Sequence, residues 1–131
     1  MTVPVLNQSV PRTGQPTHAA RDATRAFLHL AAQVRPPAQP SNADSVLLVV
    51  TELVSNALRH TRGPCALHLV LHGDHLEIRV TDTSPCRPRR RPPHVDGTGG
   101  WGWLLINHLT THVHIEPTPE GGKTICAHSP W

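Results

Sequence analysis

The sequence is poor in cysteine, and its three cysteines form no recognisable framework. Cys65, Cys86 and Cys126 are far apart, and no two of them make a CxxC pair. A disulfide-stapled fold needs an even set of cysteines, and a zinc ribbon needs closely spaced pairs. We therefore expect three free thiols and neither of these two architectures.

Long apolar runs are also missing. The longest purely apolar stretch is Val46–Val50, whereas a membrane-spanning helix needs about 20 apolar residues. The N-terminus has no basic segment followed by an apolar one, which a signal peptide would require. The sequence therefore predicts a cytoplasmic protein that makes no use of a membrane.

Aromatic residues and an excess of one charge are scarce. Eleven arginines and one lysine against nine acids leave a formal charge of only +3, and aromatics make up 3% of the residues. Arg87 and the run Arg89–Arg91 have no interleaved aromatics for base stacking. Nucleic acid is not expected as a partner. These arginines could neutralise a triphosphate, face an acidic partner or simply be solvated.

The 131 residues are enough for one domain. Residues 1–16 show no sustained apolar period and predict an extended or mobile N-terminal arm. Apolar groups at helical spacing predict one helix from Thr17, which Pro36 ends, and a second from Ser41 or Asn42 to about His60. The domain proper is thus expected over residues 17–131.

The second half of the chain alternates between short strands and turns. Apolar residues at every second position predict strands near 67–71, 76–81, 112–116 and 123–128. Gly73-Asp74 predicts a hairpin turn between the first two strands, and Glu120-Gly121-Gly122 predicts a turn between the last two. A short helix is predicted near 101–110, after a proline-, glycine- and arginine-rich loop at about 83–100. This order predicts an α/β (α+β) two-layer sandwich, with the helices on one face of a mixed, mainly antiparallel sheet.

One stripe of the second helix is polar. Glu52, Asn56 and Arg59 fall on it, opposite the apolar side. An amide oxygen can coordinate Mg²⁺ without adding charge, and a carboxylate can orient a proton-bearing nucleophile. A solvated helix face is the alternative.

Asp82 continues the core-facing row of the strand near 76–81. A buried carboxylate needs a hydrogen-bond donor, and the exocyclic amine of adenine is a suitable one. The alternative is an Asx turn over Asp82–Pro85.

A glycine-rich segment, Asp96–Gly102, leads into the third helix. Glycines allow backbone amides to approach a phosphate, and a helix N-terminus adds partial positive charge. An ordinary flexible connection is the alternative. The segment is neither a GxxxxGK[ST] P-loop nor a GxGxxG in a βαβ unit, so those two nucleotide folds are disfavoured.

These segments, in this order, resemble the motifs of the GHKL (Bergerat-type) ATPases. Glu52–His60, read ELVSNALRH, is similar to the N box of small anti-sigma-factor serine/threonine kinases. Asp82–Ser84 resembles the first glycine box, Gly97–Ile106 the second, and Gly122–Thr124 the late GT or GKT motif. The resemblance covers about residues 21–127.

The resemblance implies an ATP site with Mg²⁺. Asn56 would coordinate Mg²⁺, Glu52 would be the general base, and Asp82 would hydrogen-bond adenine, with Thr124 on the adenine side. Gly100 and Gly102 would contact phosphates through a movable lid. The nucleotide contacts implied in this way are Asn56, Asp82, Ser84, Gly97, Gly99, Gly100, Trp101, Gly102 and Thr124.

The implied activity is phosphorylation of a serine or threonine on an antagonist protein. The implied partners are a sigma factor and an anti-anti-sigma (STAS-type) protein, and a homodimer is plausible by the same analogy. Ser84, Trp101 and Trp103 differ from the residues usual in the family. The alternative is therefore an ATP-binding interaction module without phosphoryl transfer.

Histidines alternate along two of the predicted strands. His112 and His114, like His68 and His72, share one strand face and could bind zinc. The polar outer face of a half-covered sheet predicts the same alternation and is the reading we favour.

Overall fold

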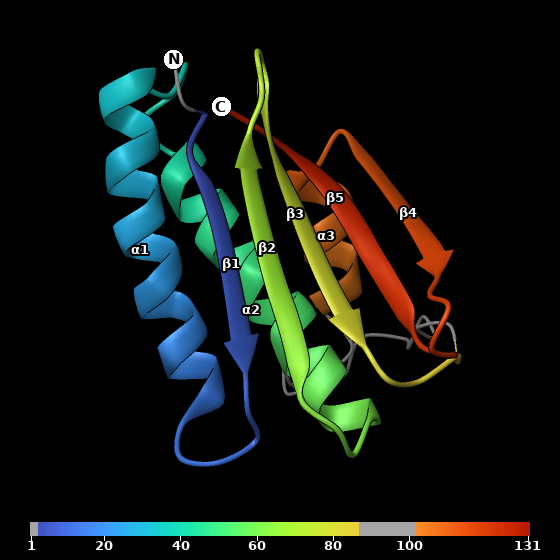
Figure 1. The fold of residues 1–131 in the computed structure, drawn as a ribbon. Helices are drawn as coiled ribbons and strands as arrows, with labels where there is room; N and C mark the ends of the chain where they lie inside the picture. Colours follow the sequence, from blue (N-terminus) through green and yellow to red (C-terminus); the bar gives the residue numbers. More distant parts are fainter. Residues whose placement is uncertain (1–2, 87–101) are drawn as a thin grey trace, which may run out of the picture.

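The computed structural model describes residues 3–86 and 102–131, and this part of the chain folds into two layers (Figure 1). A five-stranded sheet forms one layer and three helices form the other. In chain order the elements are β1 (Val5–Val10), α1 (Pro16–Val34), α2 (Asn42–His60), β2 (Cys65–Leu71), β3 (His75–Asp82), α3 (Gly102–Leu109), β4 (His112–Pro117) and β5 (Lys123–Pro130).

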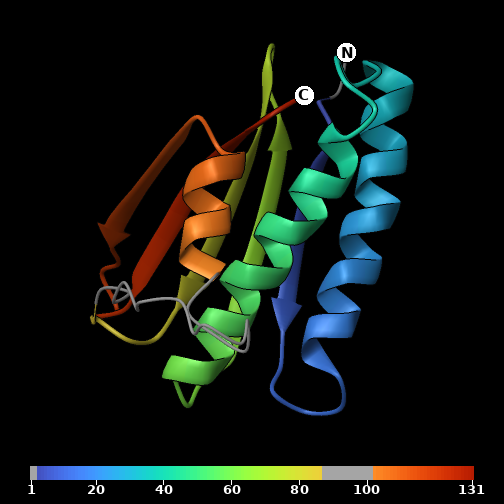
Figure 2. The ribbon, with the colours of Figure 1, turned by 180° about the vertical axis from the view of Figure 1, so that it is seen from behind.

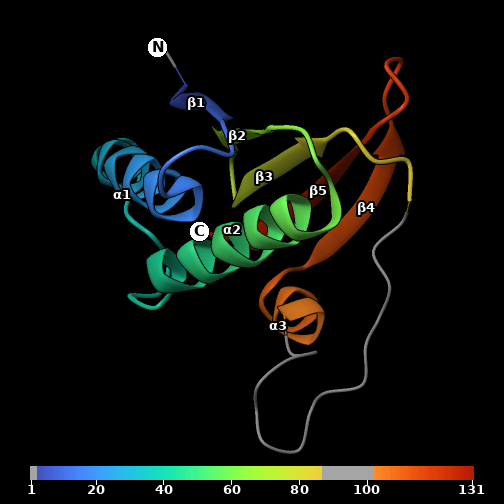
Figure 3. The same cartoon turned by 90° about the horizontal axis from the view of Figure 1, so that it is seen from below.

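The strands lie in the order β1-β2-β3-β5-β4, and all four neighbouring pairs are antiparallel. The three helices cover the same face of this sheet, as the view along the strands in Figure 3 shows. The predicted two-layer α+β sandwich is therefore confirmed. The sheet is antiparallel throughout the described residues rather than partly mixed.

The N-terminal segment contains a strand, the extended form of the predicted arm and not the mobile one. Residues Val5–Val10 form an edge strand whose register runs from Val5 opposite Val70 to Val10 opposite Cys65. Val10 is buried. The strand has only six residues, too few for a sustained apolar period. Its order comes from hydrogen bonds to β2, which its own sequence does not reveal. α1 then begins at Pro16, where the missing N–H costs no helical hydrogen bond.

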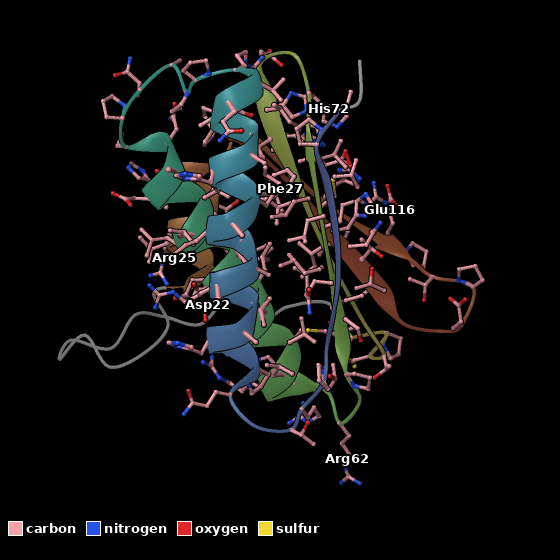
Figure 4. The ribbon with its side chains drawn as sticks, turned by 60° about the vertical axis from the view of Figure 1, so that its left-hand side comes forward. Asp22, Arg25, Phe27, Arg62, His72 and Glu116 are labelled. Carbon is pink, nitrogen blue, oxygen red and sulfur yellow. The ribbon has the colours of Figure 1, made fainter. Side chains whose placement is uncertain are left out.

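The core lies between the sheet and the two long helices. α2 crosses the sheet diagonally between α1 and α3 (Figure 2), and its fully buried side presents Val46, Val50, Leu53 and Val54 to the strands. Phe27 fills the space between α1 and the sheet (Figure 4). The apolar period that predicted α2 is therefore the side that positions it, which leaves its opposite edge for polar groups.

The tight turns fall where the sequence predicts them. Gly73 and Asp74 join β2 to β3, and Gly121, with a φ of 90°, lies in the turn from β4 to β5. Among the described residues, none of the helices is both long and apolar enough to cross a membrane.

Candidate functional site

The polar stripe of α2 lies beside α3. Glu52 and Asn56 are each partly exposed, while Leu53 and Ala57, the residues that follow them, are buried. Figure 3 shows α2 and α3 as neighbours on the helical side of the sheet. The third residue of the predicted stripe, Arg59, is exposed one turn beyond. The stripe thus borders the end of the glycine-rich segment rather than open solvent alone.

Glu52 is brought against the first residue of α3. A Cβ built on Gly102 would come within 2.1 Å of Glu52 Oε2 and 3.1 Å of Cδ. Any larger residue would require the carboxylate to turn away, whereas a glycine lets it stay at this point. The helix dipole favours a negative charge near the start of a helix. The contact joins the N-box helix to the last glycine of the predicted phosphate loop, across 50 positions of sequence.

Asp82 is buried at the end of β3 and paired with a lysine. Its side chain and that of Lys123 are 3% and 6% exposed, with Lys123 Nζ 2.9 Å from Oδ2 and 3.1 Å from Oδ1. The burial agrees with the core-facing row. The backbone N–H of Ser84 also donates to Oδ1 at 2.9 Å, so the Asx turn weighed as the alternative is present as well.

Lys123 was missed by the sequence analysis. It is the only lysine of the chain, it is 5% exposed, and its ammonium also donates to the carbonyl oxygen of Ser84 at 3.2 Å. A buried ammonium requires a charged partner. The signal available in the sequence was the position of this single lysine at the start of a strand predicted to be half buried.

Thr124 lies on the other face of the sheet from Asp82. The register places Lys123 opposite Asp82 and Thr124 opposite Thr81, and the two threonine hydroxyls are 2.7 Å apart. Neighbouring strand residues point to opposite faces, so a shift of one position changes which side chain meets Asp82. The register thus places Lys123 rather than Thr124 beside Asp82, and the adenine contact of Thr124 stays a prediction.

Gly122, in the late motif Gly122–Thr124, lies close against the backbone of Asp82. A Cβ on Gly122 would lie 2.0 Å from the carbonyl oxygen of Asp82 and 3.1 Å from Cα of Thr83. The glycine therefore permits β5 to begin in contact with the end of β3.

The charge of Asp82 also acts on a nearby thiol. Burial and then the charge of Asp82 raise the pKa of the Cys65 thiol to about 11.

Several predicted contacts lie outside the described residues. Gly97, Gly99, Gly100 and Trp101 belong to this group, as does most of the predicted lid at 83–100. Of the lid, Thr83–Cys86 are described, and the N–H of Cys86 donates to Ser84 Oγ at 3.2 Å. The contact of Glu52 with Gly102 is accordingly the one direct link between the α2 stripe and the glycine-rich segment in the described part of the chain.

The donors and acceptors present suit a magnesium nucleotide. Asn56 offers an amide oxygen and Glu52 a carboxylate at one edge of α2, and hard cations prefer oxygen ligands. Asp82 offers a buried acceptor whose charge Lys123 already balances. The set can therefore receive a cation bound to phosphate at one end and a hydrogen-bond donor at the other.

Comparison with known families agrees with this arrangement. The family described as "Histidine kinase-like ATPase domain" matches residues 14–128. No curated protein matches the chain. The family match spans α1 to β5 and contains Glu52, Asn56, Asp82 and Lys123. The chain therefore belongs to the histidine kinase-like (GHKL) ATPase family, which implies that it binds ATP.

Proposed function

We propose that this protein binds Mg-ATP between α2, α3 and the end of β3, and phosphorylates a serine or threonine of an antagonist protein. The observation that carries the proposal is the position of Glu52 against Gly102. It sets a carboxylate at the end of the glycine-rich segment, where the phosphates of a nucleotide held by backbone amides would end.

The base of the nucleotide would be read by Asp82. Within the described part of the chain, Oδ2 of this carboxylate accepts a hydrogen bond only from Lys123, whereas Oδ1 accepts from Lys123 and Ser84. A carboxylate oxygen has two acceptor sites. Oδ2 therefore retains one for the exocyclic amine of adenine.

Asn56 would hold Mg²⁺. It lies one helical turn after Glu52 on the same edge of α2. The cation neutralises charge on the phosphates of the nucleotide. A neutral amide suits this position because a second carboxylate beside Glu52 would repel both it and the triphosphate.

Glu52 would act as general base in the transfer. The hydroxyl oxygen of the protein substrate forms a bond to the γ-phosphorus, the bond between that phosphorus and the β,γ-bridging oxygen breaks, and ADP leaves. The hydroxyl proton passes to the carboxylate of Glu52. Positioning of these groups supplies most of the rate in such reactions.

The proposed partners are a sigma factor and a STAS-type anti-anti-sigma protein, with the latter as substrate, and a homodimer as the assembly. The support for these partners is the resemblance of Glu52–His60 to the N box of anti-sigma-factor kinases. An ATP-binding module without transfer is the competing function.

Incubation of the full chain with γ-labelled ATP, Mg²⁺ and a panel of purified STAS-type proteins tests transfer. We expect label on one substrate, with Glu52→Gln lowering the rate about 10²- to 10⁴-fold. Asp44→Asn, an exposed acid on the same helix, is the matched control and should transfer normally. ATP binding without label on any substrate would favour the competing function.

ATP binding itself has a separate readout. Trp103 is half buried in α3, beside the end of the predicted phosphate loop, and the chain has no tyrosine. Tryptophan fluorescence and calorimetry should report binding that needs Mg²⁺ and is lost in Asn56→Ala but kept in Gln33→Ala, an exposed position on α1. If neither method detects ATP, the proposal is wrong.

A further inference from the structure

The face of the sheet turned away from the helices carries a dense group of metal-ligating side chains. Figure 4 shows His72 and Glu116 on this face, opposite the helical layer. Strand alternation places the remaining members on the same face. The group comprises His72, His75, Glu77, His112, His114, Glu116, Cys126 and His128, with Arg79 among them as a positive charge.

We propose that Glu77, Cys126 and His128 form a binding site for a borderline transition-metal ion of the Zn²⁺ class. One potential ligand atom from each of the three lies within 4.8 Å of the others. Glu77 and His128 are directly opposed on β3 and β5, and Cys126 is two positions away from His128 on the same face. Two adjacent antiparallel strands thus bring an oxygen, a sulfur and a nitrogen ligand together.

The separation is close to what a tetrahedral ion requires. Zinc bonds of about 2.0–2.3 Å place two tetrahedral ligand atoms about 3.3–3.8 Å apart. The ligand atoms, which lie within 4.8 Å of one another, are therefore at most about 1.0–1.5 Å farther apart than in a closed site, and small side-chain rotations can close this gap. Thiolate and imidazole ligands together favour Zn²⁺ over Mg²⁺ or Ca²⁺.

Neighbouring side chains already orient the carboxylate. His72 Nε2 lies 3.0 Å from Glu77 Oε2, and Arg79 donates to Oε1 at 3.1 Å. Partners of this kind fix the direction of a metal-binding carboxylate. Arg79 also pairs with Glu116 at 2.8 Å, so its positive charge is shared between two acids.

A fourth ligand is within reach. The ring of His75 stacks on that of His128 with centroids 4.3 Å apart, and the His112 ring lies 5.1 Å from it. Either imidazole or a water can complete a tetrahedron around three protein ligands.

A plain polar face accounts for alternating histidines but not for the place of Cys126. This cysteine faces outward from the sheet, yet it is 1% exposed because the surrounding side chains cover it. A thiol at the centre of imidazoles and carboxylates is the arrangement of a metal site. Bound metal would tie β3 to β5, the strands whose opposite ends carry Asp82 and Lys123.

Cobalt titration of the full chain, without a histidine tag, tests the site. We expect one Co²⁺ per chain, with the intense d–d bands of tetrahedral cobalt, a thiolate-to-metal charge-transfer band, and displacement by Zn²⁺. Cys126→Ser should remove the charge-transfer band, and His128→Gln should weaken binding at least tenfold. Cys86→Ser and His68→Gln, an exposed cysteine and a histidine on the same face beyond the cluster, are the matched controls.

A second readout is thermal stability. Zn²⁺ that binds the folded chain should raise its Tm in a concentration-dependent way, and Cys126→Ser should lose this rise. The proposal is overturned if cobalt spectra lack the charge-transfer band, or if Cys126→Ser and His128→Gln bind like the two controls. Because no nucleotide takes part, the result is independent of whether the protein binds ATP.

Discussion

Gly102 and Glu52 meet at the junction of α2 and α3, where a Cβ on the glycine would lie 2.1 Å from Oε2 of the carboxylate. The contact explains in physical terms why a glycine stands at the first position of α3. Any side chain there would displace the group that we propose as the general base.

Gly102→Ala should therefore displace the carboxylate of Glu52. We expect phosphoryl transfer to fall by at least about tenfold, or 1.4 kcal/mol in the barrier, with a loss of at most about 1 kcal/mol in the free energy of unfolding, because the overlap is with the end of a flexible, partly exposed side chain that can turn away. Transfer assays and urea unfolding measure the two effects. Gly73→Ala, where nothing lies within 4 Å of the new Cβ, is the control.

Gly102→Ala in a Glu52→Ala background tests whether the overlap with the Glu52 side chain causes the loss of stability. The shortened side chain removes the atoms that the new methyl group would meet. Gly102→Ala should then cost little further stability, and an equal cost in both backgrounds would contradict the contact.

Lys123→Met should destabilise the fold because it leaves the carboxylate of Asp82 buried without a countercharge. Removal of one partner of a buried ion pair typically costs about 3–5 kcal/mol. Chemical unfolding of Lys123→Met, Asp82→Asn and the double variant forms a complete cycle. We expect the double variant to be more stable than Lys123→Met alone, and strict additivity would rule out the pairing.

Gly122→Ala should push the start of β5 away from the end of β3. Its Cβ would meet the backbone carbonyl of Asp82 at 2.0 Å, and backbone atoms cannot move aside as a flexible side chain can. We expect a fall of about 2–4 kcal/mol in the free energy of unfolding, together with weaker ATP binding. A stability equal to that of Gly73→Ala would show that β5 can shift without cost.

Cys65 should make the fold sensitive to alkaline pH. Burial, reinforced by Asp82 and opposed by Arg12, raises its pKa from 9.0 to about 11. The folded protein holds this proton more tightly than the unfolded chain, so the stabilisation is complete below pH 9 and is lost as the pH rises toward 11.

The measurement is the free energy of unfolding in urea between pH 8 and 11. It should fall less steeply for Cys65→Ala than for the natural chain, by about 1–3 kcal/mol over the interval. Cys126, whose pKa burial also raises to about 11, is common to both proteins. Parallel curves would show that Cys65 is not the group responsible.

Local pattern was sufficient for most of the architecture. The apolar spacing of α2 predicted the helix and its buried side, because a helix repeats every 3.6 residues within its own sequence. The β2–β3 turn at Gly73-Asp74 was predicted from turn-forming residues in the same way. The family resemblance was confirmed over residues 14–128, while the nucleotide roles of individual residues stay predictions.

Pairing between distant segments was not predictable in this way. The order of the strand Val5–Val10 does not follow from its own sequence, because β2, more than 50 positions later, supplies its hydrogen bonds. The place of Lys123 beside Asp82 has a similar origin. Which of two neighbouring strand residues meets Asp82 depends on register, and a shift of one residue reverses the faces.

By itself the sequence determined the helices, the turns, the polar stripe of α2 and membership of an ATP-binding family, since each depends on residues close together or on an ordered set of motifs. Only the tertiary structure decided that Glu52 lies against Gly102, that Asp82 is paired with Lys123, and that Glu77, Cys126 and His128 converge. Those contacts arise from sheet register and helix packing, which bring together side chains whose separation along the chain carries no periodic signal.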